Sequence, residues 1–370
     1  MSTNKRINII CVCTIILALI VTVLFMNGEK LGLKVIVDED AERNEESQYF
    51  TSNDLNGDWD ISDATVIKLE NSEVTFQGSG AYAYDGDIYI TQAGKYVVSG
   101  TLDDGKIVVD AYNSSKVWIM LDDAHITCSD DVALDVEKAD KVFLSLANGT
   151  ENELITGKDY SDEAENDNRT GVVLARDDLT INGSGSLTIK SEYKHGIVAK
   201  DDLVIANGNI TIDVPGDGIR VKEIFKYANA SLSVIAEDDG IVINDEGGYF
   251  YMESGNINID SDDDGINTMT DIKIAGGNME ISSGDDGIHS DSAVYIDGGD
   301  ILIAKAYEGV EAPVIEMSDG NVEIYPTDDG FNANGGNGDM FGMGGPGMGG
   351  GSDGSGMGGG PSGRGGFGRD

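Results

Sequence analysis

The 370-residue chain is poor in the residues that build cross-linked or metal-clustered domains. Its three cysteines are Cys11, Cys13 and Cys128, and the first two lie in an apolar run, so a disulfide framework or a cysteine-rich zinc site is excluded. The three histidines are widely separated, which argues against a zinc or haem site. Aromatic residues make up only 7% of the chain, so any core must be mainly aliphatic.

Basic residues are also scarce. The chain has 24 Lys and Arg against 67 Asp and Glu, a formal net charge of −43. Nucleic acid binding requires clustered positive charge and is therefore excluded as a function. A folded chain with this excess of carboxylates must spread them widely or neutralise them with cations. From about residue 61 to residue 334 the acids alternate with Ile and Val, which indicates a folded domain rather than an acidic disordered segment.

A single long apolar run lies near the N-terminus. It covers residues 7–26, contains no charged residue and follows Lys5 and Arg6. The length suits a membrane-spanning helix, and the basic residues before it favour a cytoplasmic N-terminus. A cleaved signal peptide is the alternative. Both interpretations place the rest of the chain outside the cytoplasm, so we expect an extracellular protein that is either anchored to the cell surface or secreted.

A repeat of about 22 residues runs through the folded region. Its marker is Asp-Gly-Ile or a close variant, at residues 195–197, 217–219, 239–241, 264–266, 286–288, 308–310 and 329–331. Each unit also contains alternating apolar segments, such as 272–274 and 279–281, separated by Gly, Asn and Asp. Such alternation predicts strands, and a unit this short can bury its apolar face only by stacking on its neighbours. The sequence therefore predicts an all-β parallel solenoid, with positive φ at the corner glycines.

The composition divides the chain into four parts. We expect a cytoplasmic stub with an anchor or signal peptide over 1–26 and a polar linker over 27–60. The β-solenoid is expected over 61–334, and a disordered Gly/Met-rich tail over 335–370.

Stacking would align the acidic residues of the marker turns in columns about 4.8 Å apart. The candidate metal ligands are Asp217, Asp238, Asp239, Asp262, Asp263, Asp264, Asp285, Asp286, Asp328 and Asp329. Carboxylates this close repel one another unless their pKa values rise or cations bind between them. Ca²⁺ takes about six to eight oxygen ligands, including carboxylates and turn carbonyls. We therefore expect a row of Ca²⁺ sites, with the alternative that Asp-Gly serves only as a favoured turn dipeptide.

Four further segments, together with the Asp-Gly-Ile turns, carry a resemblance to a known family. They are ITQAGKYVVSGTL (90–102), GKIVV (105–109), LANGTEN (146–152) and DLTINGSG (178–185). The chain resembles, over about residues 61–335, the carbohydrate-binding β-helix family of bacterial cell-surface proteins that bind cellulose and acidic sugars such as polygalacturonate. The resemblance implies a right-handed parallel β-helix similar in fold to pectate lyases, with bound calcium and no established catalysis.

The function that we expect is Ca²⁺-dependent, non-catalytic binding of a polysaccharide. An acidic glycan could be bridged to the aspartates by Ca²⁺. Cellulose could instead contact aromatic faces, for which the candidates are Tyr249, Tyr251, Tyr295 and Tyr307. These rings could equally pack against the solenoid.

Two other functions stay open from the sequence. A polysaccharide lyase would need a basic residue beside a bound uronate, and Arg220 and Lys222 follow one Asp-Gly-Ile turn, one repeat after Lys194 and His195. The same basic residues could form surface salt bridges of little energetic value. A structural surface rod with calcium between its turns is the other alternative.

Overall fold

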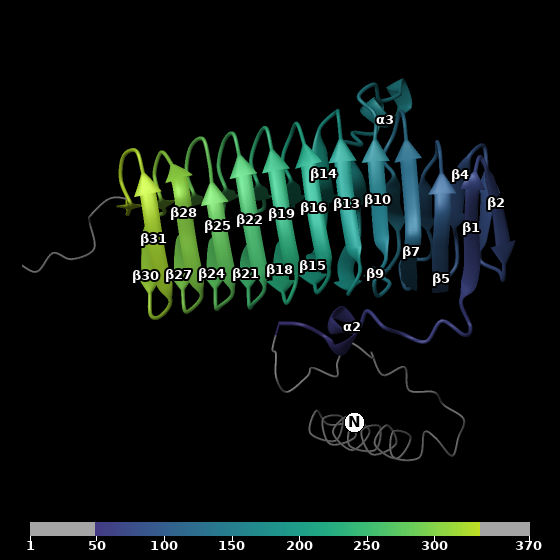
Figure 1. Cartoon of the computed structure of the whole chain (residues 1–370), viewed down its shortest axis with the longest axis horizontal. Helices are drawn as coiled ribbons and strands as arrows, with labels where there is room; N and C mark the ends of the chain where they lie inside the picture. Colours follow the sequence, from purple (N-terminus) through teal and green to yellow (C-terminus); the bar gives the residue numbers. More distant parts are fainter. Residues whose placement is uncertain (1–48, 334–370) are drawn as a thin grey trace, which may run out of the picture. The chain divides into compact units, whose positions relative to one another are not determined.

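The computed structural model describes residues 49–333, and these form a parallel β-solenoid of about 11 turns with about 23 residues per turn. Figure 1 shows the turns side by side along the long axis of this part of the chain. Equivalent residues pair from turn to turn, as Ile197 does with Ile219 and Ile219 with Ile241. The expected all-β solenoid is confirmed, whereas its right-handed coil stays a prediction.

Three parallel ladders of strands form the walls of the solenoid. Ladder 1 is a separate 12-stranded sheet, and its members are β3 (Ala81–Tyr84), β4 (Asp87–Ile90), β6 (Ile107–Asp110), β8 (Leu134–Lys138), β11 (Gly171–Ala175), β14 (His195–Ala199), β17 (Ile219–Val221), β20 (Ile241–Ile243), β23 (Ile266–Thr268), β26 (Ile288–Ser290), β29 (Val310–Glu311) and β32 (Phe331–Asn332). Only β3 is antiparallel to its neighbour.

Ladders 2 and 3 belong to a 20-stranded sheet. Ladder 2 contains β5 (Gly94–Leu102), β7 (Lys116–Cys128), β9 (Lys141–Leu146), β12 (Asp178–Gly183), β15 (Leu203–Ala206), β18 (Ile224–Ala228), β21 (Tyr249–Met252), β24 (Asp271–Ile274), β27 (Ala293–Ile296) and β30 (Val314–Met317). Ladder 3 contains β10 (Glu151–Thr156), β13 (Ser186–Ser191), β16 (Asn209–Val214), β19 (Ser231–Ala236), β22 (Asn256–Ser261), β25 (Asn278–Ser282), β28 (Asp300–Ala306) and β31 (Asn321–Pro326). The long strands β5 and β7 continue from ladder 2 into ladder 3.

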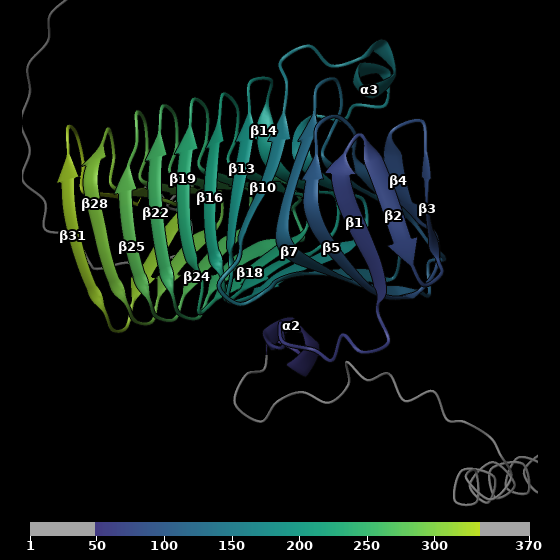
Figure 2. The ribbon, with the colours of Figure 1, turned by 45° about the vertical axis from the view of Figure 1, so that its right-hand side comes forward.

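The first turn is closed by a hairpin. The strand β1 (Thr65–Asn71) pairs in parallel with β5 and antiparallel with β2 (Glu73–Gln77). Figure 2 shows this hairpin at the end of the described solenoid. An antiparallel strand at this position protects the first parallel rung, which is the capping that a solenoid requires.

The core is a stack of aliphatic side chains. Ile197, Ile219, Ile241, Ile266 and Ile288 align in one column of ladder 1, and none has more than a trace of exposed surface. Burying one such side chain contributes about 2 kcal/mol. The inward column therefore explains why each Asp-Gly pair is followed by an apolar residue.

The two glycine-containing corners use glycine for different reasons. Between ladders 2 and 3, Gly255, Gly277 and Gly299 have φ values of 95°, 93° and 92°, as expected. The glycines of the Asp-Gly-Ile turns do not have positive φ, which corrects the expectation for that corner. A Cβ at Gly240 would lie 2.5 Å from the carbonyl oxygen of Gly265 on the next turn, so glycine is required there by close packing of the turns.

The described end of the expected polar linker is packed on ladder 2. Phe50 is 1% exposed and belongs to a buried cluster with Val204, and the short helix α2 (Ser52–Leu55) lies against β12 and β15. Trp59 donates its indole N–H to the Ser145 hydroxyl at 2.9 Å. Residues 49–60 therefore form part of the folded domain, because their few apolar side chains have a complementary apolar strip on the outer face of ladder 2.

A charged insertion after β10 covers part of the outer face of ladder 1. It contains α3 (Asp162–Asn166), whose Ala164 packs with Tyr160 against Leu174 and Val198. Within residues 49–333 no helix is both long enough and apolar enough to cross a membrane. The expected anchor over 1–26 and the expected tail over 335–370 lie outside the described residues.

Candidate metal and carbohydrate sites

The Asp-Gly-Ile turns place their aspartates at the corner between ladders 3 and 1. Asp239, Asp264 and Asp286 stack on successive turns, because the isoleucines two residues after them pair in register. One carboxylate oxygen of Asp239 accepts the backbone N–H of Asp264 at 2.9 Å, and Asp264 accepts that of Asp286 at the same distance. The column is therefore held by carboxylate–backbone hydrogen bonds and brings negative charges close together.

Two levels of this column are neutralised by protein cations. Asp217 is 1% exposed and forms an ion pair with the guanidinium of Arg220. Asp286 lies 3.1 Å from His289, whose pKa rises to about 9 mainly through this hydrogen bond. The imidazolium also lies 3.3 Å from Glu311. At these two levels, a metal ion would compete with a cation that the chain already supplies.

At the levels between them, no Lys, Arg or His of residues 49–333 forms an ion pair with the aspartates of the column. Asp238, Asp239 and Asp263 present carboxylate oxygens within 4.8 Å of one another, and Asp263, Asp264 and Asp285 form an equivalent group. Burial, together with neighbouring carboxylates, raises the pKa of Asp239 to about 7 and that of Asp264 to about 6. Both groups offer only oxygen donors, which suits a hard cation such as Ca²⁺. Because crowding and burial make these carboxylates costly to ionise, a bound cation would offset that cost.

The other predicted metal ligands do not join these groups. Asp262 is exposed and lies outside every such cluster of the described chain, although it precedes Asp263 directly. Asp328 and Asp329 are exposed on the last described turn and likewise belong to no cluster among residues 49–333. The described structure thus brings five of the ten predicted ligands together in two adjacent groups, and metal binding at any of the ten stays a prediction.

Two further clusters were not foreseen. One combines Asp286 with His289 and Glu311, and the other combines Asp201, Asp202 and Glu223. The third residue after the marker Asp varies as Arg220, Val242, Asn267 and His289, and the Arg, Asn and His side chains each contact the Asp of their own turn. Reading this position along the repeat would have identified which levels carry their own cation.

The predicted sugar-binding tyrosines differ in accessibility. Tyr251 is 6% exposed, because Tyr49 stacks on its ring with a centroid distance of 3.8 Å. Tyr249 and Tyr295 are partly buried, whereas Tyr307 is 49% exposed. The ring of Tyr251 therefore packs against the solenoid and is not open to a sugar. Sugar binding by Tyr249, Tyr295 and Tyr307 stays a prediction.

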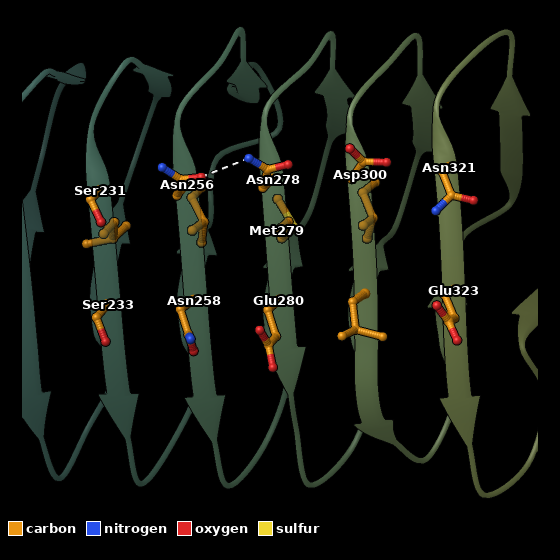
Figure 3. A pocket seen from close by; sticks show the side chains of 14 residues that line it. Ser231, Ser233, Asn256, Asn258, Asn278, Met279, Glu280, Asp300, Asn321 and Glu323 are labelled. Atoms are coloured by element: carbon orange, nitrogen blue, oxygen red, sulfur yellow. Dashed lines mark hydrogen bonds between the residues drawn. The ribbon is translucent and has the colours of Figure 1, made fainter.

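A polar groove that the sequence reasoning missed runs across ladder 3. It has a volume of about 510 Å³ and extends from β19 to β31 (Figure 3). Asn256, Asn278, Asp300 and Asn321 follow one another in register along one edge, and the Asn278 amide donates to the Asn256 side-chain oxygen at 2.9 Å. The signal in the sequence was the polar residue that follows each positive-φ glycine.

A second row of polar side chains lines the groove. Ser233, Asn258, Glu280 and Glu323 occupy the outward positions two residues further along their strands (Figure 3), and the apolar Leu302 stands between Glu280 and Glu323 in this row. Amides both donate and accept hydrogen bonds, whereas carboxylates only accept them. The groove therefore offers a periodic set of partners for hydroxyl groups and contains no aromatic ring.

Comparisons with known proteins agree with this architecture. A curated relative from Acetivibrio thermocellus, described as a carbohydrate-binding domain-containing protein, is 34% identical over 148 residues, which cover 40% of this chain and 52% of the relative. The chain thus spans about half the length of that relative. The solved structure of the polysaccharide lyase-like protein from C. thermocellum, as a gadolinium derivative, is 25% identical with a TM-score of 0.53, covering 73% of this chain and 99% of the other.

The family comparison covers most of the solenoid. Residues 84–330 match the family described as carbohydrate-binding domain-containing protein, which confirms the family resemblance found in the sequence. Because the match covers two thirds of the chain, the chain belongs to the family of carbohydrate-binding domain-containing proteins.

Proposed function

We propose that this protein is an extracellular, non-catalytic polysaccharide-binding protein whose Asp-Asp-Gly turns hold Ca²⁺. The observation that carries the proposal is the ladder 3 groove, where amide and carboxylate side chains recur at the spacing of the strands. A polysaccharide likewise repeats its hydroxyl groups along its length, so one chain lying along the groove can make the same contact on several turns. The extracellular location rests on the N-terminal apolar run of the sequence.

The charge of the groove favours a neutral glycan. Glu280, Asp300 and Glu323 line it and accept hydrogen bonds from sugar hydroxyls, but they would repel a uronate carboxylate. A cellulose-like chain therefore suits the groove. An acidic glycan such as polygalacturonate needs positive charge, and Ca²⁺ supplies it when bound to the aspartate groups.

The two aspartate groups are suited to this bridging role. Asp238, Asp263 and Asp285 are exposed, whereas Asp264 is buried and fixed by its hydrogen bond to Asp286. Asp264 thus positions the second group and the half-buried Asp239 the first, while the exposed members face solvent, where a glycan could approach. The solved relative was obtained as a gadolinium derivative, and a trivalent lanthanide, like Ca²⁺, is a hard cation that prefers oxygen ligands.

The test is retention of the full chain on insoluble cellulose and on polygalacturonate, each with Ca²⁺ or with EDTA. The double variant Asn256→Ala, Asn278→Ala should weaken binding to cellulose about thirtyfold, at about 1 kcal/mol for each of the two lost hydrogen bonds. Asn113→Ala, at an exposed turn outside the groove, is the matched control and should not change it. Chelation should reduce retention on polygalacturonate.

Other outcomes would replace the proposal. A protein that binds neither polysaccharide under any of these conditions would favour the structural rod. Release of unsaturated uronate from polygalacturonate would identify a lyase. The solved relative is described as polysaccharide lyase-like, so this assay is part of the test.

A further inference from the structure

Three cationic side chains converge on one small pocket on the outer face of ladder 1. The pocket has a volume of about 240 Å³ and is lined by Lys200, Arg220 and Lys222, together with Val198, Ala199 and Asn244. The chain as a whole has 24 basic residues against 67 acidic ones. If charged residues were distributed at random in so acidic a chain, most pockets would be lined by carboxylates. A pocket lined by three cationic side chains and no carboxylate therefore requires an explanation.

The repeat itself brings these cations together. Ala175, Ala199 and Val221 pair in register at the ends of β11, β14 and β17, so the residues that follow them stack on successive turns. These are Arg176, Lys200 and Lys222, at the strand spacing of about 4.8 Å. Arg220 lies in the neighbouring column, in register with Val198.

Two of the pocket cations have carboxylate partners, and the third has none. Arg220 forms its ion pair with Asp217, and Lys222 lies 3.3 Å from Glu223 and 3.9 Å from Asp245. Lys200 forms no ion pair with any residue from 49 to 333. Its ammonium is therefore available to an external anion.

The charges that surround Lys200 are positive. Arg176 and Lys222 flank Lys200 on the turns before and after it, and Arg220 lines the same pocket. Like charges placed this close repel one another, and an anion placed among these groups would relieve that repulsion. No fold-stabilising contact of the Lys200 amine with a described carboxylate offsets this cost, which argues against a purely structural role for its charge.

We propose that this cationic pocket (Lys200, Arg220 and Lys222) binds a carboxylate of an acidic saccharide directly, without a metal ion. The inference rests on the proposed function for the identity of the ligand as a glycan. Cations on successive turns match a polymer that carries one carboxylate per sugar better than they match a single free anion. The pocket would thus provide a second, calcium-independent route to acidic polysaccharides, on a different face from the ladder 3 groove.

The experiment is isothermal titration calorimetry of the full chain with trigalacturonate in the presence of EDTA. Lys200→Gln should weaken binding about tenfold, because one charge-assisted hydrogen bond is lost. Lys200→Arg keeps the charge and should retain most of the affinity. Lys190→Gln removes an exposed lysine from ladder 3 with the same change in net charge, and should alter binding less than about twofold. Wild-type binding should also weaken as salt is raised.

Parallel titrations with cellotriose and with inorganic phosphate separate the alternatives. The proposal holds if only trigalacturonate binding depends on Lys200. Binding of phosphate as tight as that of trigalacturonate would identify a site for a free oxyanion and overturn it. An equal loss of cellotriose binding in Lys200→Gln would overturn it too, since the substitution would then act through the fold.

The proposed calcium-dependent function can survive the failure of this inference. Trigalacturonate binding that requires Ca²⁺ and ignores Lys200→Gln would reject the cationic pocket and leave the aspartate groups as the site. A wild-type protein that binds no saccharide with or without Ca²⁺ would reject both.

Discussion

The carboxylate of Asp239 accepts the backbone N–H of Asp264 from the next turn at 2.9 Å. This hydrogen bond holds the turns of Asp239 and Asp264 in register, but it also keeps the two carboxylates close together. Asp264 repeats the arrangement with Asp286, where His289 then provides a compensating charge. The uncompensated stretch between Arg220 and His289 is the place where we expect a divalent cation to have the largest effect.

Asp263 belongs to both uncompensated groups, whereas Asp262 belongs to neither. We therefore expect Asp263→Asn to weaken Ca²⁺ binding at least about tenfold, because both groups lose a charged ligand. Calorimetric Ca²⁺ titration measures the change. Asp262→Asn removes the same charge from the adjacent exposed position and should leave the affinity unchanged. Equal effects of the two substitutions would mean that only general electrostatic attraction is involved.

The stability of the metal-free protein should fall as the pH rises. The pKa of Asp239 is raised to about 7 and that of Asp264 to about 6, so in this range the unfolded chain has already released protons that the folded chain retains. The raised pKa of His289, about 9, acts in the same direction, since its stabilising charge is lost as the pH rises through that value. We expect the Tm in EDTA to decrease from about pH 5 to about pH 8.

Added Ca²⁺ should reverse this trend at the alkaline end. The ion binds the ionised carboxylates and therefore stabilises the folded state most where the metal-free protein is weakest. Thermal unfolding at matched pH with and without Ca²⁺ measures the difference. A Tm in EDTA that is constant between these pH values would show that the aspartate column ionises without cost.

Arg220 should be more important for stability than its partial exposure suggests. Its removal in Arg220→Gln leaves the buried carboxylate of Asp217 without a counter-charge, and we expect a loss of about 2 kcal/mol. The double variant Asp217→Asn, Arg220→Gln should recover much of this loss, because no buried charge remains. Chemical denaturation of the three variants measures the coupling, and simple additivity would contradict the buried-pair explanation.

Phe50 should fix the N-terminal segment to ladder 2. Replacing the ring in Phe50→Ala removes it from the buried cluster that it forms with Val204, Ala206 and Ala228, at a cost of about 3 kcal/mol. We expect faster amide hydrogen exchange in residues 49–60 while the strands of the solenoid remain protected. Tyr82→Ala, at a ring that is 49% exposed, provides the control. Unchanged exchange in the segment would mean that Asp54 and Trp59 suffice to hold it.

The packing of residues 49–60 could not be predicted from their composition. Their polar residues suggested a linker, and the decisive partners lie far away in sequence: Asp54 receives a hydrogen bond from Thr180 at 2.6 Å and an ion pair from Lys141 at 2.9 Å. Such contacts exist only after the turns have stacked. The ladder 3 groove was missed for a similar reason, since each turn contributes only one or two of its polar side chains.

The sequence by itself determined the repeat, the strands and the register. Apolar alternation and the Asp-Gly-Ile marker recur at nearly constant spacing, and only one way of stacking buries every marker isoleucine. The tertiary structure alone decided which aspartates lack a counter-charge, which tyrosines are covered and where Lys200 meets Arg220 and Lys222. Periodicity specifies which residues share a column, but the electrostatic environment of a side chain depends on everything that lies within a few ångströms of it, including segments from outside the repeat.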